Sequence, residues 1–289
     1  MAMTSILAVV DGGSGSEALL KGSFALARKL QAYLEVLHVE PDPRDALPVV
    51  GEGMTGTLVE QVSADIEARR EAALKAARSA FEAQCEAFGV EAKSADGSRS
   101  YKTFGVAWTQ VQGREDEFVA DLGRFFDLIA VAHPGGDEGS AYAPALEAGL
   151  FQCGRPVLVL PKSGPDFPGD KAAIAWNGSR EAVRAITAAM PLLEAAKSVQ
   201  VISIDGDGEA AALERLSAFL AGHGIEPKYR KLSAGNSEVG SLLLREAQDC
   251  EASLVVMGAY GHSRLREFVL GGATRSVLHE SSVALLLAH

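Results

Sequence analysis

Four glycines near the end of the chain have a spacing that suits a ligand-binding loop. The apolar run Leu254–Met257 has the length of a buried strand and is rich in β-branched residues. Gly258 and Gly261 follow it at once, and the pair Gly271-Gly272 comes after nine more residues. Glycines in such a loop let backbone N–H groups approach a ligand closely.

A helix is predicted to begin at about Ala273, with Thr274 in its first turn. A helix N-terminus carries a partial positive charge and unpaired N–H groups. A glycine loop that joins a strand to such a helix suits a phosphate. The alternative is that the glycines serve only to permit tight turns.

The pattern Gly258-x2-Gly261-x9-Gly271 resembles the nucleotide loop of the universal stress protein family, G-x2-G-x9-G-(Ser/Thr). The resemblance implies that these glycines meet the ribose and phosphates of an adenine nucleotide such as ATP, ADP or AMP. Gly272 stands where the family has a hydroxyl that contacts a phosphate. Thr274 could supply that hydroxyl, or could bond within its own helix.

Two further strand ends are expected beside this loop, because ligands of open parallel sheets bind beyond the carboxyl ends of the strands. They are Trp176-Asn177-Gly178 and Ser203-Ile204-Asp205. By resemblance, the backbone of Ile204 would meet the adenine edge. Asn177 stands where the family has an Asp near the ribose and phosphates. Asn keeps hydrogen-bonding capacity but has no negative charge, which argues against a role for Mg²⁺.

Basic side chains inside the loop are candidates for neutralising phosphate charge: His262, Arg264 and Arg266, with Arg275 one turn into the next helix. They could equally pair with Glu267. No catalytic or metal-binding residue is predicted, since the sequence has no P-loop, nucleophile elbow or metal-ligand spacing. The predicted nucleotide-binding residues are Trp176, Asn177, Gly178, Ile204, Met257, Gly258, Gly261, His262, Arg264, Gly271, Gly272, Ala273 and Thr274.

The elements that must position these residues occur twice in the chain. A strand at Ser5–Asp11, a helix and a second strand at Tyr33–Val39 are echoed by Ala172–Asn177, Glu181–Leu193 and Val199–Asp205. Helices between apolar strands favour parallel β-α-β units. We therefore predict an α/β chain with two domains, residues 1–162 and 170–289, joined by the proline- and glycine-rich linker Pro161–Gly169.

The family resemblance covers nearly the whole chain in tandem form. It implies two Rossmann-like domains, akin to adenine nucleotide alpha hydrolases, each with a five-stranded parallel sheet and flanking helices. It also implies an internal pseudo-dimer, in which Val157–Leu160 and Ala284–Leu287 pair across the domain interface. Both runs are apolar and would promote aggregation as unpaired edge strands. We therefore expect another part of the protein to cover them on physical grounds too.

The first copy departs from the second in two ways. It carries a loop at Pro41–Gly56 and a long helix at about Leu58–Phe88, which is either ordinary core packing or a lid or partner surface. Its fourth strand ends in Ala132-His133-Pro134, with alanine at the place of the first glycine and a proline that lacks an amide donor. We expect no standard nucleotide site there, although Asp11 is the acidic residue that the family has after its first strand.

Charge and composition exclude other classes. Of the net charge of −11, residues 1–170 carry −10, from 15 Lys/Arg and 25 Asp/Glu, which leaves −1 for residues 171–289. Neither half has the basic footprint of a nucleic-acid-binding protein. No apolar run is long enough for a membrane span, no signal peptide is recognised, and Cys85, Cys153 and Cys250 are scattered. A cytoplasmic location is expected.

Three functions follow from these observations. The first is a regulatory universal stress protein, not a metabolic catalyst, that binds an adenine nucleotide in its second half and works through an unidentified protein partner. The second is a nucleotide-free scaffold that recruits proteins. The third is a slow ATP hydrolase that uses the same loop. The internal pseudo-dimer leaves a homodimer open.

Overall fold

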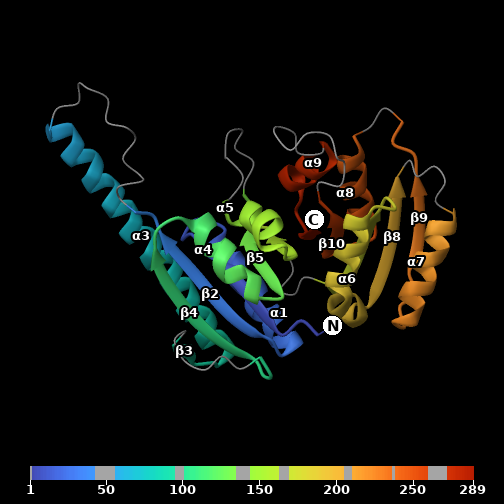
Figure 1. The fold of residues 1–289 in the computed structure, drawn as a ribbon, viewed down its shortest axis with the longest axis horizontal. Helices are drawn as coiled ribbons and strands as arrows, with labels where there is room; N and C mark the ends of the chain where they lie inside the picture. Colours follow the sequence, from blue (N-terminus) through green and yellow to red (C-terminus); the bar gives the residue numbers. More distant parts are fainter. Residues whose placement is uncertain are drawn as a thin grey trace.

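The computed structural model describes residues 2–42, 56–94, 101–134, 144–162, 169–204, 210–235, 238–259 and 272–289. The loop predicted at Pro41–Gly56 and the linker predicted at Pro161–Gly169 lie mostly outside these residues. Figure 1 shows the two halves of the chain side by side, each with strands flanked by helices. No helix in the described ranges has the length and apolar character needed to cross a bilayer.

The first half follows the predicted order of strands and helices. Its elements are β1 (Ser5–Val9), α1 (Ser16–Leu30), β2 (Tyr33–Glu40), α3 (Gly56–Phe88), β3 (Ala92–Ser94), β4 (Gly105–Gln112), α4 (Glu115–Leu122), η1 (Gly123–Phe125), β5 (Leu128–Ala132), α5 (Pro144–Glu147), η2 (Ala148–Cys153) and β6 (Val157–Leu160).

The second half repeats this order of strands and helices with fewer elements. Its elements are β7 (Lys171–Trp176), α6 (Arg180–Ala195), β8 (Ser198–Ile204), α7 (Ala210–Gly222), β9 (Lys228–Leu232), α8 (Val239–Asp249), β10 (Leu254–Gly258), α9 (Gly272–Glu280) and β11 (Ala284–Ala288). The helix expected from about Ala273 thus begins one residue earlier.

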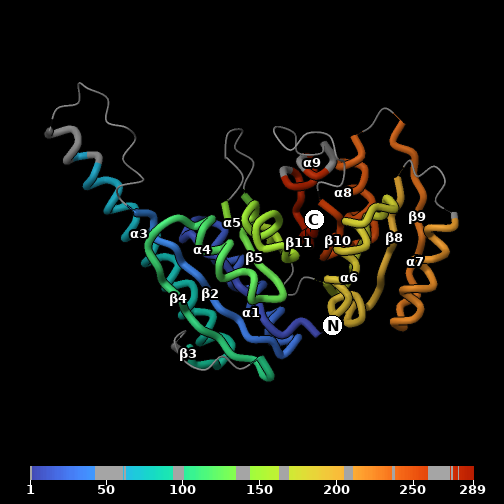
Figure 2. Tube along the Cα trace, viewed as in Figure 1, coloured from blue at the N-terminus to red at the C-terminus, as the bar shows by residue number. Residues whose placement is uncertain are grey.

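All the described strands form one sheet, in the order β3-β4-β2-β1-β5-β6-β11-β10-β7-β8-β9. Neighbouring strands are parallel except at the centre, where β6 and β11 run antiparallel with Leu158 opposite Leu286. This confirms the predicted pairing of the last strand of each copy. Each strand covers an edge that the other half would otherwise leave open. Figure 2 follows the trace through this junction in the middle of the molecule.

The α/β fold with a mostly parallel sheet and flanking helices is therefore confirmed, with one change. The second half has the five strands expected, whereas the first half has six among its described residues. The extra strand is β3, which follows Gly89 and pairs only with β4. Because β4 takes the place beside β2 that β9 takes beside β8, β3 is displaced to the edge.

The core lies on both faces of the sheet. One face is covered by α1, α3, α6 and α7, which contribute Phe24, Phe81, Ile186 and Leu220 to a single cluster across both halves. The other is covered by α4, α5, η2, α8 and α9. Such burial of apolar side chains on two faces explains why the strands read as continuous apolar runs.

The long helix α3 packs in the core along its second part only. Its second part packs in the core, where Ala77 and Phe81 are fully buried. Its first part extends beyond the edge of the sheet (Figure 1), and Ser63, Ala64 and Asp65 are exposed there. The apolar stripe thus serves core packing from about Leu74 onward.

Candidate functional site

The three strand ends of the second half that were expected to converge belong to adjacent strands. β7 lies between β10 and β8, with Met257 opposite Ala175 and Trp176 opposite Ser203. The chain leaves β7 toward β8 on one side, while β10 lies on the other, so this is the point at which the strand order reverses. Ligands of open α/β sheets bind in the crevice at such a point.

The turn after β7 is organised by hydrogen bonds of its own. Asn177 Oδ1 accepts from the Ser179 backbone N–H at 3.1 Å, and Gly178 takes a left-handed conformation with φ of +73°. Ser179 is the N-cap of α6, and its Oγ accepts from the Ala182 N–H at 3.1 Å. The Asn177 carbonyl oxygen is therefore used in shaping the turn, which sequence reasoning did not anticipate.

The first half has the same turn after β1. Asp11 Oδ1 accepts from the Gly13 N–H at 2.8 Å and from Ser16 Oγ at 3.0 Å, and Gly12 has φ of +81°. The two turns differ in what surrounds them. A Cβ placed on Gly12 would lie 2.1 Å from the carbonyl oxygen of Ala73 in α3.

The described residues place no comparable cover over the second turn. A Cβ placed on Gly178 would meet no atom of the described residues within 4 Å. Among the described residues, the carboxyl edge of the sheet is thus covered by the backbone of α3 at Gly12, whereas no atom covers Gly178. This difference favours the second half as the ligand-binding half, and it comes from the helix that lengthens the first copy.

Gly258, the first glycine of the motif, has a packing role. A Cβ at this position would lie 2.6 Å from the Ala182 backbone nitrogen and 2.8 Å from Glu181 Cβ. The end of β10 therefore rests directly on the first turn of α6. Close packing alone requires glycine here, so Gly258 is weaker support for a ligand than the spacing suggests.

The helices that follow β7 and β10, α6 and α9, differ in the charge of their first turns. The first turn of α6 contains Glu181, which is buried and accepts a hydrogen bond from Arg180 Nε at 2.6 Å. Burial raises the pKa of Glu181, but the Arg180 bond and its own backbone N–H outweigh it and hold the pKa below its usual value. This carboxylate complements the N-terminus of α6.

The first turn of α9, by contrast, contains no acidic residue. Of the two helix starts, that of α9 is therefore the one suited to an external anion. Thr274 in this turn is 5% exposed, so its hydroxyl does not face open solvent.

The remaining predicted residues divide into those that are described and those that are not. Trp176 and Met257 are each 6% exposed at their strand ends, and Ile204 is partly buried. The indole Nε1 of Trp176 has no hydrogen-bond partner among the described residues. Gly261, His262, Arg264, Arg266, Glu267 and Gly271 lie outside the described residues, as do the side chains of Ala273 and Arg275.

The described residues contain no cluster of three or more His, Cys, Asp or Glu side chains able to hold a metal ion.

Comparison with known proteins gives a family for the second half. Residues 173–289 match the model of the Universal stress protein family. No curated protein sequence matches the chain.

Solved structures resemble the whole chain. A universal stress protein from Archaeoglobus fulgidus DSM 4304 is similar over 98% of this chain and 95% of its own, with 16% identity and a TM-score of 0.65. A protein of unknown function from Pseudomonas aeruginosa PAO1 is similar over 99% and 92%, with 18% identity and a TM-score of 0.60. At such identities the likeness concerns the fold, and it extends to the first half.

Proposed function

We propose that this chain, whose residues 173–289 form a domain of the universal stress protein family, binds one adenine nucleotide in its second half and acts as a regulator. The supporting observation is the turn at Gly178 beside the ends of β7, β8 and β10, which no described residue covers, in contrast with the covered turn at Gly12. The glycine motif joins this edge to α9, so its amides are suited to the phosphates.

The other expected assignments belong to the same proposal. Domain boundaries at residues 1–162 and 170–289, a cytoplasmic location, a role in the stress response and an unidentified protein partner are inferred from the sequence and the resemblance. We do not include Mg²⁺ in the proposal, because Asn177 has no carboxylate and its oxygen bonds within the turn. The basic residues His262 and Arg264 are proposed to face the phosphates.

The two tryptophans provide a direct test. Trp176 lies at the proposed site, whereas Trp108 lies on β4 in the first half. In a Trp108→Phe variant, ATP, ADP or AMP should change the fluorescence of Trp176; in a Trp176→Phe variant, the remaining signal should not respond. Absence of any response to all three nucleotides at millimolar concentration in the first variant would contradict the proposal.

Loop variants separate binding from folding. Gly271→Val should weaken nucleotide binding at least tenfold, because a branched side chain blocks the close approach of backbone to phosphate. Gly222→Val in α7 is the matched control, since a Cβ there meets no described atom outside its own helix within 4 Å. Native mass spectrometry of protein purified without added nucleotide should show a bound adenine nucleotide. Phosphate release, measured alongside, distinguishes a regulator from a slow hydrolase.

A further inference from the structure

An arginine lies at the start of α6, just after the turn that no described residue covers. Arg180 is the first residue of this helix, and it follows Gly178 by two positions. Its side chain is 79% exposed. The helix after the covered turn of the first half, α1, begins instead with Ser16, Glu17 and Ala18. Of the two corresponding turns, only the uncovered one is therefore followed by a cation in the first turn of its helix.

The guanidinium of Arg180 is anchored by a carboxylate that is itself buried. Arg180 Nε donates to Glu181 Oε1 at 2.6 Å, and the side chain of Glu181 is 3% exposed. This bond uses one of the five N–H groups of the guanidinium. The terminal nitrogens of Arg180 have no partner in the part of the chain that the structure describes. The anchor thus orients a planar donor and leaves its two terminal nitrogens for a ligand.

The anchor also determines where the guanidinium lies. Glu181 Cβ is 2.8 Å from the place that a Cβ on Gly258 would occupy, so Glu181 lies against the end of β10. A phosphate bound beside Gly258 is repelled by this carboxylate unless a cation offsets the charge. Arg180 is that cation, because it is bonded to the same carboxylate. Arg184, one turn further along α6, is engaged elsewhere, since its Nη1 donates to the carbonyl oxygen of His289 at 3.0 Å.

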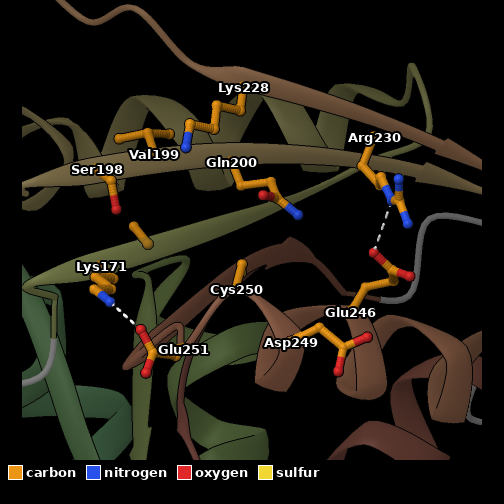
Figure 3. A pocket seen from close by; sticks show the side chains of 11 residues that line it. Lys171, Ser198, Val199, Gln200, Lys228, Arg230, Glu246, Asp249, Cys250 and Glu251 are labelled. Atoms are coloured by element: carbon orange, nitrogen blue, oxygen red, sulfur yellow. Dashed lines mark hydrogen bonds and ion pairs between the residues drawn. The ribbon is translucent and has the colours of Figure 1, made fainter.

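A similar pair at the opposite edge of the sheet has different surroundings. Arg230 Nε lies 3.2 Å from Glu246 Oε2, and the side chain of Arg230 is 60% exposed. This pair lines a cavity of about 470 Å³ at the amino ends of β7, β8 and β9 (Figure 3). Asp249 and Glu251 line the same cavity, so acidic side chains already balance its basic ones. An arginine on a buried glutamate is thus not in itself an anion site, and the uncovered turn is what distinguishes Arg180.

We propose that Arg180 binds the phosphate chain of the nucleotide, so that the second half selects nucleoside di- and triphosphates over monophosphates. This inference rests on the function proposed above and names the ligand class of that site. Backbone amides of a glycine loop and a helix N-terminus suffice for one phosphate. A long, exposed guanidinium beyond them adds a planar donor that matches two further phosphate oxygens. Glu181 acts as a positioning residue, since it contacts Arg180 and not the ligand.

The test is a calorimetric titration of the full-length protein with adenosine, AMP, ADP and ATP. ADP and ATP should bind at least about tenfold more tightly than AMP, because they add charge-assisted hydrogen bonds to Arg180. Arg180→Gln should lower this preference about tenfold. Adenosine has no phosphate, so it should bind the variant and the unsubstituted protein equally.

Two further variants separate the contact from net charge and from folding. Arg230→Gln is the matched control: it removes another exposed arginine that is bonded through Nε to a buried glutamate, and it should leave the preference unchanged. Arg180→Gln alone leaves Glu181 buried without its partner, which lowers stability. The double variant Arg180→Gln/Glu181→Gln leaves no unpaired charge, and it should still lack the preference.

The inference is overturned if AMP binds the unsubstituted protein as tightly as ATP, or if Arg180→Gln keeps the full preference for ATP. It is also overturned if Arg230→Gln loses the preference to the same extent, or if the double variant retains it. Nucleotides that bind without any role for Arg180 contradict this inference alone. Absence of binding by all three nucleotides at millimolar concentration contradicts the proposed function as well.

Discussion

Gly258 lies so close to the amide nitrogen of Ala182 that the end of β10 and the first turn of α6 touch through their backbones. The first half has a similar close contact, but there the glycine lies on the helix and not on the strand. There Gly15 begins the helix side, and a Cβ on it would lie 2.8 Å from the Cβ of Ala132 at the end of β5. In both halves, therefore, a glycine allows the end of the strand to pack closely against the start of the helix.

This contact predicts a stability cost at Gly258. Gly258→Ala should lower the free energy of unfolding by about 1–3 kcal/mol, because the added methyl group overlaps the backbone of α6. Gly178→Ala should cost about 1 kcal/mol, from its left-handed φ alone. Urea denaturation of the two variants provides the comparison. An equal or smaller cost at Gly258 would show that the close approach does not exist in solution.

The cover over Gly12 predicts the stoichiometry of nucleotide binding. Because the α3 backbone at Ala73 occupies the space above the first turn, one nucleotide should bind per chain. Isothermal titration calorimetry measures this ratio. Two nucleotides per chain of comparable affinity would mean that α3 moves away from Gly12, and the asymmetry between the halves would lose its functional meaning.

The buried part of α3 should contribute far more to stability than the projecting part. Phe81 is fully buried, with its ring 5.8 Å from that of Phe24 and 5.2 Å from that of Trp108. Phe81→Ala should cost about 3–5 kcal/mol. Ile66→Ala, on the projecting part, should cost less than about 1 kcal/mol. Thermal or urea unfolding checks both, and a similar cost for the two variants would contradict the assignment of the core.

Asp127 should make folding pH-dependent. Its Oδ2 accepts from the backbone N–H groups and hydroxyls of Thr4 and Ser5 at 2.8–3.1 Å. Burial raises the pKa of this carboxyl, but the four hydrogen bonds outweigh it and lower the pKa below the ordinary value. A lowered pKa stabilises the fold above the unfolded value of about 3.9, and this contribution is lost as the pH falls through the folded pKa.

Asp127→Asn should therefore destabilise the protein by about 1–3 kcal/mol at pH 7. The difference from the unsubstituted protein should shrink below a pH of about 3.9. Urea denaturation across this range provides the measurement. A difference that stays constant with pH would indicate that the ionised carboxylate is not what holds the first strand.

The repeated order of strands and helices, and the pairing of the last strand of each copy, could be predicted because apolar runs and the family pattern specify them. The position of β4 in the sheet could not be predicted. A strand follows the second described helix of each half, β3 after α3 and β9 after α7, yet in the first half β4 displaces β3 from the position beside β2. Sheet position depends on tertiary pairing, which a local pattern does not contain.

The site was predictable to a similar degree. The meeting of β7, β8 and β10 follows from topology, but the approach of Ala73 to Gly12 depends on how a 33-residue helix leans across the sheet. The use of Asn177 in its own turn had a signal, since an Asn-Gly-Ser run before a helix is typical of a turn with an N-cap.

The β6–β11 pairing has a consequence for self-association. Both terminal strands of the two copies are occupied at the centre of one sheet, which leaves β3 and β9 as the outer strands among the described residues. β3 has three residues, and β9 contains Lys228, Arg230 and Lys231. Short and charged outer strands resist addition of a further chain. We therefore expect an assembly of two such molecules to use helices or loops, so that it can form or separate without opening a strand of the sheet.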